Sequence, residues 1–315
     1  MPRGRRGPDV MVAAVTAVLR IGTRGSALAL IQARLVAAAF ARLGQSVQLV
    51  TVTTDGDRRA PDTAWGEGAF VKSIEEALLD GRVDVAVHSA KDVPTDEDAR
   101  LRIAAYLPRA DARDALVTAD PAARSLDELP RHASVGTDSP RRTAFALAHR
   151  PDLRVRPIHG NVDTRLRRLD AGEVDALVLA CAGLDRLGRA DRIAQRVEPD
   201  RMTPAPGQGA LAVQVRRDDA RTLAIAAALD DQATRVAVEA ERDVLRAAGG
   251  GCRSPIGAYA EVVGGEVLVI CGHVELDGTG LRIGRRAGPV ADAGAIAVSL
   301  YRQLSTGEAM LGVAP

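Results

Sequence analysis

The chain has 315 residues, which is long enough for two or three domains with separate hydrophobic cores. Its net charge of +1 and its aromatic content of 2% argue against a nucleic-acid-binding protein, which needs a basic surface and stacking side chains. No apolar run reaches the roughly 18 residues of a membrane span. The three cysteines are too few and too scattered for a disulfide framework or a zinc cluster, and no other spacing suggests a metal site.

Residues 1–18 are expected to be a disordered extension. Arg3, Arg5 and Arg6 precede a short apolar piece at 11–19, which is short for a signal core and lacks a clear small-residue cleavage site. The sequence therefore predicts a cytoplasmic protein.

Strands and helices are then expected to alternate. The expected elements are a strand at 18–23, a helix at 26–43, a strand at 47–53, a loop at 54–68, a helix at 69–79 and a strand at 83–88. Between the first strand and helix lies Arg24-Gly25-Ser26. Here free amide groups and Ser26 can cap the helix and hold an anion.

The segment 85–94 is the first candidate for chemistry. An alternation of Val and Ala changes abruptly to His-Ser-Ala-Lys-Asp, and Pro94 cannot continue the hydrogen bonding of a sheet. Polar groups at the carboxyl end of a buried strand face the crevice where open α/β sheets bind ligands. Asp92 beside Lys91 is thus a candidate reactive group, although a solvated turn explains the segment equally well. His88 is interpreted as a hydrogen-bonded residue at the strand end.

The same pattern recurs in the second part of the chain. Val135-Gly136-Thr137 resembles Ile21-Gly22-Thr23, and Ser139-Pro140 then begins a helix. A strand at 153–158 and a helix carrying Thr164 and Arg165 follow, and 170–178 repeats the Gly, Val and Asp spacing of 79–87. We expect two β-α-β-α-β lobes, each with a parallel sheet covered by helices. The segments 102–117 and 205–216 would cross between the lobes, with Pro204-Ala205-Pro206-Gly207-Gln208-Gly209 as a hinge.

From residue 218 the pattern changes to that of a small α+β domain. We expect helices at 220–229 and 234–247, antiparallel strands at 256–263, 266–273 and 281–286, and a last helix at 291–303. The predicted fold class is α/β with two lobes and this third domain. The predicted boundaries are 1–18 for the extension, 19–108 with 205–218 for lobe 1, 109–204 for lobe 2 and 219–315 for the C-terminal domain.

Arginines recur at the strand-to-helix junctions. A helix start offers amide donors, and a guanidinium adds a bidentate fork for carboxylate or phosphate. Several such sites facing one cleft imply a ligand with many negative groups, although any single arginine in this arginine-rich chain is more simply a surface residue. All but two of the 42 basic residues are arginines, so Lys72 and Lys91 stand out as compact point charges. The junction arginines are Arg24, Arg141, Arg142, Arg165 and Arg186.

Cys252 follows three glycines, where a permissive backbone would let a bulky adduct approach, and Arg253 is adjacent. An unreactive loop cysteine is the alternative. Cys181 and Cys271 end or occupy apolar strands and are interpreted as core residues.

Together these segments resemble the hydroxymethylbilane synthase family, also called porphobilinogen deaminases. The match extends in the family's order from about residue 19 to residue 262, and later residues match only in general pattern. The pieces that carry it are IGTRGSALAL from Ile21, FVKSIEEALLDGRVDVAVHSAKDVP from Phe70, VGTDSPRR from Val135, GNVDTRL from Gly160, LACAGLDRLG from Leu179, PAPGQGAL from Pro204 and GGGCRSPIGAYAE from Gly249.

The resemblance implies two periplasmic-binding-protein-like lobes and a cysteine-bearing third domain. It implies a dipyrromethane cofactor joined through a thioether to Cys252, one per chain, and stepwise condensation of four porphobilinogen molecules to hydroxymethylbilane with loss of ammonia, in tetrapyrrole and heme biosynthesis. A cytoplasmic monomer with no nucleic-acid or membrane partner is expected.

The resemblance also implies roles for individual residues. Asp92 would stabilise the azafulvenium cation that remains when ammonia leaves and would move protons at the pyrrole nitrogens, with Lys91 beside it. The cofactor would be held by Arg24, Ser26, Lys91, Thr137, Ser139, Arg141, Arg142, His159 and Arg165. The substrate would be held by Arg24, Ser26, Arg142, His159, Arg165 and Arg186.

Two positions depart from the family pattern. His159 stands where the family usually has arginine before Gly-Asn-Val, and histidine is shorter and only partly charged near neutrality. We expect weaker carboxylate binding and slower turnover that improves at mildly acidic pH. Glu67, in the loop 55–68, replaces a lysine of some relatives. A divergent, weakly active paralogue and a non-catalytic bilobed binder of an anionic small molecule are therefore the alternatives.

Overall fold

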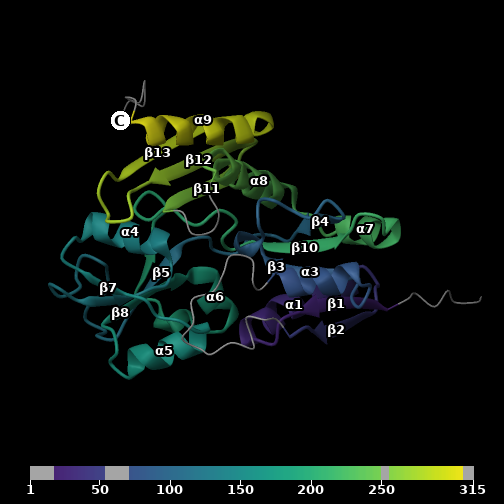
Figure 1. Cartoon of the computed structure of the whole chain (residues 1–315), viewed down its shortest axis with the longest axis horizontal. Coiled ribbons are helices and arrows are strands. Elements are labelled where there is room, and N and C mark those ends of the chain that lie inside the picture. The colour runs from purple at the N-terminus through teal and green to yellow at the C-terminus, as the bar shows by residue number, and fades with distance from the viewer. Residues whose placement is uncertain (1–17, 54–70, 250–254, 308–315) are drawn as a thin grey trace, which may run out of the picture.

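The computed structural model describes residues 18–53, 71–249 and 255–307. Cys252, the loop 55–68 and all of the N-terminal extension except Val18 lie outside the described residues. Figure 1 shows two α/β lobes side by side, with the C-terminal domain packed across both.

The sheet of lobe 1 has the strand order β2-β1-β3-β10-β4. β1 is parallel to β2 and β3, as expected, but β10 is antiparallel to both β3 and β4. The predicted parallel core is confirmed in β2, β1 and β3, and β10, which enters from the hinge, runs antiparallel beside it. The strands are β1 (Leu19–Thr23), β2 (Val47–Thr51), β3 (Val85–Ser89), β4 (Leu101–Tyr106) and β10 (Leu211–Arg216), and the helices are α1 (Ala27–Arg42), α3 (Lys72–Leu79) and α7 (Ala220–Ala227).

Lobe 2 repeats this topology with the order β7-β6-β8-β5-β9. β6 is parallel to β7 and β8, and β5 is antiparallel to β8 and β9. The repeated strand order is what the sequence repeat predicts. The strands are β5 (Asp114–Thr118), β6 (Ser134–Gly136), β7 (Arg154–Arg156), β8 (Ala176–Ala180) and β9 (Gln195–Val197), and the helices are α4 (Pro140–His149), α5 (Val162–Asp170) and α6 (Cys181–Arg186).

The C-terminal domain packs two helices on a three-stranded antiparallel sheet of order β11-β12-β13. β11 and β12 have the predicted bounds, whereas β13 continues to Pro289 because it pairs with the whole length of β12. The elements are α8 (Gln232–Ala247), β11 (Ile256–Val263), β12 (Glu266–His273), β13 (Arg282–Pro289) and α9 (Ala293–Thr306).

Cys181 and Cys271 are buried, as predicted for core residues, although Cys181 is the first residue of α6 rather than the last of a strand. None of the helices described here is long and apolar enough to cross a membrane.

Candidate functional site

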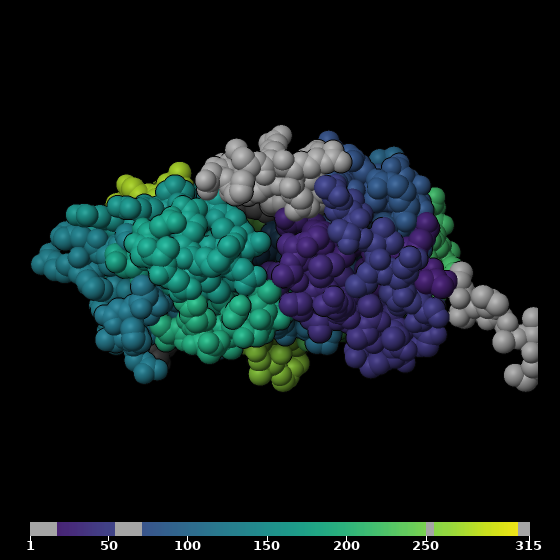
Figure 2. Space-filling view, turned by 90° about the horizontal axis from the view of Figure 1, so that it is seen from below, coloured from purple at the N-terminus to yellow at the C-terminus, as the bar shows by residue number. Residues whose placement is uncertain are grey.

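A cavity of about 620 Å³ lies between the two lobes. Figure 2 views the molecule from the side on which the lobes meet. The parallel strands of both sheets end toward this cavity, as expected for a ligand site in open α/β sheets. Its lining includes Arg24, Ser26, Thr51, Lys91 and Asp92 from lobe 1, and Arg142, Gly160, Asn161, Arg165 and Leu179 from lobe 2.

Asp92 ends the short 3₁₀ helix η1 (Ala90–Asp92), which follows β3 directly. Its side chain lines the cavity and is exposed there. Partial desolvation in the cavity raises the pKa of the Asp92 carboxyl, although the charges of Lys91 and Arg24 act in the opposite direction. Two cations therefore lie near the Asp92 carboxylate, yet its neutral form is favoured more in the protein than it would be in water.

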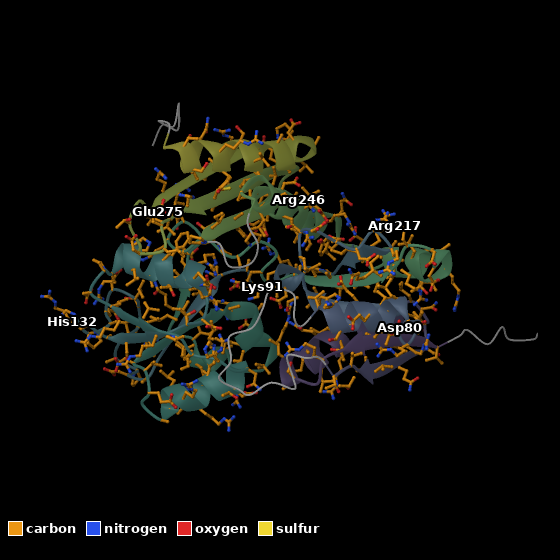
Figure 3. The ribbon with its side chains drawn as sticks, in the orientation of Figure 1. Asp80, Lys91, His132, Arg217, Arg246 and Glu275 are labelled. Carbon is orange, nitrogen blue, oxygen red and sulfur yellow. The ribbon has the colours of Figure 1, made fainter. Side chains whose placement is uncertain are left out.

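Lys91 lies near the centre of the molecule, between the lobes (Figure 3). Its Nζ donates a hydrogen bond to Oε1 of Gln208 at 3.1 Å. Burial, together with the charge of Arg142, lowers the pKa of Lys91 to about 8. An anionic ligand that binds here would favour the ammonium form again.

Arg142 reaches the cavity from the first turn of α4, and a buried carboxylate holds it. Its Nε and Nη2 lie 2.9 and 2.8 Å from Oδ1 of Asp114, which is 0% exposed. The positive charges of Arg141 and Arg142 hold the pKa of the Asp114 carboxyl below its usual value, despite burial. Asp114 thus fixes the Arg142 guanidinium in one orientation.

Arg141 is not among the side chains that line the cavity. Its Nη2 lies 2.7 Å from Oδ2 of Asp114, and its Nη1 donates to the carbonyl of Thr203 at 2.7 Å. Both ends of this guanidinium are therefore engaged inside the protein, and the position does not favour the predicted contact with a cofactor.

Arg165 carries a positive charge that is only partly compensated. Its Nε donates to the carbonyl of Gly160 at 2.9 Å. Burial and the nearby Arg142 lower the pKa of Arg165 to about 10, and Asp138 opposes this shift. The half-buried Arg165 beside the buried Arg142 therefore forms a site suited to a carboxylate.

The remaining predicted residues support the site from behind, or lie beside it. Ser26 and Ser139 cap α1 and α4 by accepting from the amides of Ala29 and Arg142, and Thr137 accepts from the amide of Ser139. Arg186 donates to the carbonyl of Gly209 at 2.7 Å. Of these, only Ser26 lines the cavity.

His159 does not line the cavity either. Its Nδ1 lies 3.0 Å from Oδ2 of Asp138, although the two groups are not aligned as a hydrogen bond. The imidazole therefore faces a carboxylate of the protein itself. Sequence reasoning missed this partner.

Sequence reasoning also missed the side-chain roles of Asp114 and Gln208. Asp114 lies within the expected crossing segment 102–117 and belongs to no motif, and Gln208 is predicted only as part of the hinge. Among the described residues, no cluster of three or more potential ligands could hold a metal ion.

Comparison with known proteins gives consistent matches across the chain. The family model for the dipyrromethane cofactor binding domain of porphobilinogen deaminase matches residues 19–224, and that for the porphobilinogen deaminase C-terminal domain matches residues 235–305. The porphobilinogen deaminase of Mycobacterium ulcerans is 51% identical over 247 residues, which cover 78% of each chain. That of Mycobacterium tuberculosis H37Rv is 50% identical over 78% of this chain and 79% of its own length.

Among solved structures, a substrate-binding domain of a putative amino acid ABC transporter from Streptococcus pneumoniae is 13% identical. It covers 74% of this chain and 94% of its own, with a TM-score of 0.45. The sequence matches, which span both lobes and the C-terminal domain, show that the chain belongs to the porphobilinogen deaminase family.

Proposed function

We propose that this chain is a hydroxymethylbilane synthase, a transferase that condenses four porphobilinogen molecules and one water to hydroxymethylbilane and four molecules of ammonia. The observation that carries the proposal is that one carboxylate, Asp92, shares a cavity with cations from both lobes, Arg24 and Lys91 on one side and Arg142 and Arg165 on the other. Porphobilinogen carries an acetate and a propionate, so this charge pattern suits it and its oligomers.

The residues of this cavity also suit a dipyrromethane cofactor. The cavity volume of about 620 Å³ is within the range of small-molecule sites, and the lowered pKa of Arg165 indicates positive charge that an added carboxylate would stabilise. We propose that Cys252 carries the cofactor through a thioether. When bound, the dipyrromethane supplies the nucleophilic pyrrole to which the first substrate is joined.

We propose that Arg142 and Arg165 hold carboxylates of cofactor and substrate from lobe 2, and that Arg24, Ser26 and Lys91 do so from lobe 1. Arg142 is preorganised because Asp114 fixes its guanidinium. Thr137, Ser139 and Arg141 are proposed to act through the position of Arg142, and Arg186 through the hinge. His159 is proposed to contribute less than an arginine would, because it faces Asp138.

Asp92 is the proposed catalytic residue. Positive charge develops on porphobilinogen as ammonia leaves, and the Asp92 carboxylate is positioned to stabilise it without reorganisation. Its raised pKa also suits a group that accepts a proton and returns it within one cycle. Lys91 supplies a neighbouring positive charge that favours the ionised carboxylate and so opposes the rise in its pKa.

The experiment is to incubate the purified full chain with porphobilinogen and to measure ammonia and hydroxymethylbilane together, while the intact mass of the protein is recorded. We expect four ammonia per product and a mass above that of the sequence by two pyrrole units, and we expect Cys252→Ser to lose both. Binding of porphobilinogen without ammonia release would favour a non-catalytic bilobed binder. An enzyme that carries the cofactor but turns over slowly would favour a divergent paralogue.

We further propose that the protein acts in the cytoplasm as a monomer, in tetrapyrrole and heme biosynthesis, without nucleic-acid or membrane partners. The proposed domains are 19–108 with 205–218, 109–204 and 219–315, except that α7 packs on β4 and β10 and so belongs with lobe 1. Gel filtration with light scattering would test the monomeric state.

A further inference from the structure

The hinge residue Gln208 uses its whole side-chain amide inside the protein. It lies between β9 and β10 and is 1% exposed. Its Oε1 accepts from Nζ of Lys91 at 3.1 Å and from Nη2 of Arg142 at 3.2 Å. Its Nε2 donates to the carbonyl of Ala112 at 2.7 Å and to Oδ1 of Asp114 at 2.9 Å. All the hydrogen-bonding positions of the amide are therefore occupied.

These partners also determine the orientation of the amide. Lysine and arginine side chains can only donate, whereas a carbonyl and an ionised carboxylate can only accept. A flipped amide would place its NH₂ against two cations and its oxygen against two acceptors. Oε1 must therefore face Lys91 of lobe 1 and Arg142 of lobe 2, so a single neutral oxygen joins a cation from each lobe.

The backbone around Gln208 is held equally firmly. The amide of Gly207 donates to Oε2 of Glu241 at 2.6 Å, and the carbonyl of Gln208 accepts from Nε of Arg109 at 2.8 Å. Gly207 has φ +76°, and a Cβ there would lie 3.0 Å from the backbone of Ala90 and Lys91. The hinge thus rests directly against η1 and is anchored to α8 of the C-terminal domain through Glu241.

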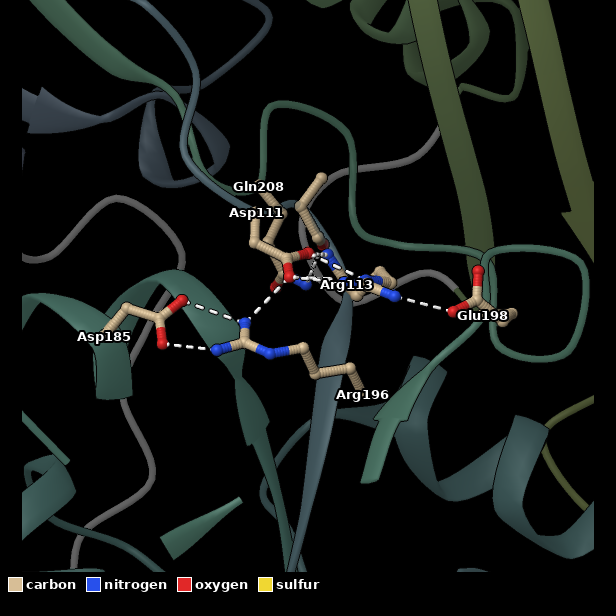
Figure 4. A network of polar contacts seen from close by, with 7 residues as sticks. Asp111, Arg113, Asp185, Arg196, Glu198 and Gln208 are labelled. Carbon is tan, nitrogen blue, oxygen red and sulfur yellow. Dashed lines mark hydrogen bonds and ion pairs between the residues drawn. The ribbon is translucent and has the colours of Figure 1, made fainter. Parts of the chain in front are cut away.

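On the lobe 2 side, Gln208 lies beside a network of ion pairs (Figure 4). Arg196 bridges Asp185 and Asp111, and Arg113 bridges Asp111 and Glu198. Gln208 donates to the carbonyl of Ala112, which lies between Asp111 and Arg113 in the chain. The acceptor for Gln208 therefore sits in a segment that other contacts already immobilise.

We propose that Gln208 is a positioning residue for the anion site, which holds Lys91 and Arg142 at the separation that one carboxylate-rich ligand needs and stabilises the ammonium form of Lys91. This inference rests on the proposed function, because it assigns Gln208 a part in the same site. It predicts that loss of the amide changes the protonation of Lys91 more than it changes the rest of the fold.

The charges around Lys91 make this effect measurable. Arg142 and Arg141 disfavour its ammonium form, while Asp92 and Asp114 favour it. A hydrogen bond to the charged form of a group favours that form, so Gln208 opposes the burial that lowers the pKa of Lys91. Removal of the acceptor is expected to lower that pKa further, by about half a unit to one unit.

The experiment is an NMR titration of the full chain labelled with ¹³C-lysine. Only Lys72 and Lys91 give signals, and the exposed Lys72 is the internal reference. Gln208→Met removes the amide at nearly equal volume. Gln214→Met is the matched control, because Gln214 is also buried, at 0% exposed, but bonds to His88 and Glu75 instead.

We expect the titration midpoint of Lys91 to fall in Gln208→Met and to stay at the wild-type value in Gln214→Met. Gln208→Glu, which keeps an oxygen and adds negative charge, is expected to raise the midpoint and serves if Gln208→Met does not fold. In the loaded enzyme, Gln208→Met should raise KM for porphobilinogen more at pH 8 than at pH 6.5, with a smaller change in kcat.

An unchanged Lys91 midpoint in Gln208→Met, or an equal shift in Gln214→Met, would overturn the inference. The titration is independent of turnover. If the wild-type chain released no ammonia from porphobilinogen, the proposed function would fail while the effect of Gln208 on Lys91 could still be observed.

Discussion

Asp114 gives the sharpest test of how the cavity is organised. Its carboxylate is 0% exposed and receives four polar contacts, two from Arg142 at 2.8 and 2.9 Å, one from Arg141 at 2.7 Å and one from Gln208 at 2.9 Å. Asp114→Asn removes the only negative charge among these groups and presents NH₂ hydrogens to one of the arginines. Two buried guanidinium groups then lose their counter-ion.

Removal of one partner from a buried charged pair costs about 3–5 kcal/mol, because the other charge remains buried without compensation. We therefore expect Asp114→Asn to lower the free energy of unfolding by about this amount. The measurement is urea unfolding followed by circular dichroism at pH 7. Asp98→Asn is the control, since Asp98 pairs with the exposed Arg100 at 2.6 Å, and it should cost much less.

The stability that Asp114 contributes depends on pH. The arginines lower the pKa of Asp114 in the folded state, so its contribution to stability is present above the unfolded value of 3.8 and is lost as the pH falls through the folded pKa. The difference in the free energy of unfolding between wild type and Asp114→Asn should therefore become smaller in acid. A loss no larger than that of Asp98→Asn at pH 7 would refute the claim that Asp114 neutralises both arginines.

Three further predictions concern activity. Asp92→Asn should lower kcat by about 10²–10³ with little change in KM, and a change in KM alone would argue against a catalytic carboxylate. Because the pKa of Lys91 is lowered to about 8, its charge is present below that pH, and kcat/KM should fall about tenfold from pH 7 to pH 9. Lys91→Arg should flatten the fall of kcat/KM between pH 7 and pH 9. If this variant kept the wild-type pH profile, the fall would not come from the titration of Lys91. His159→Arg should lower KM and remove any gain in turnover at mildly acidic pH. Because Asp138 can also bind the new guanidinium, the double variant with Asp138→Ser tests the arginine without that partner. Unchanged kinetics in both variants would exclude a role for position 159.

Local patterns in the sequence predicted much of the fold. Ser26 and Ser139 cap their helices as expected, since capping depends on residues within one turn. β11 and β12 have the predicted bounds because Gly264 and Gly265, both with positive φ, make a turn between two alternating runs. The direction of β10 was missed, because its partners β3 and β4 lie more than a hundred residues away in the chain.

The candidate site was predictable in composition but not in orientation. Arg141 and Arg142 are neighbours in the first turn of α4, yet one contacts Thr203 and the other lines the cavity. Adjacent helical residues project about 100° apart, and no sequence pattern gave the rotation of this helix about its axis. The proximity of His159 to Asp138 likewise depends on the pairing of β6 with β7, which places Gly136 opposite Arg156.

The proposed mechanism depends on where the cofactor lies. A second cavity of about 680 Å³, lined by Arg109, Glu198, Thr234 and Tyr259, lies between lobe 2 and the C-terminal domain and offers an alternative site. The decisive measurement is a crystal structure of the cofactor-bearing protein. We predict dipyrromethane density continuous with the sulfur of Cys252, with its carboxylates against Arg142 and Arg165 and its pyrrole nitrogens facing Asp92. Dipyrromethane density in the second cavity, or a Cys252 sulfur that points away from Asp92, would contradict this mechanism.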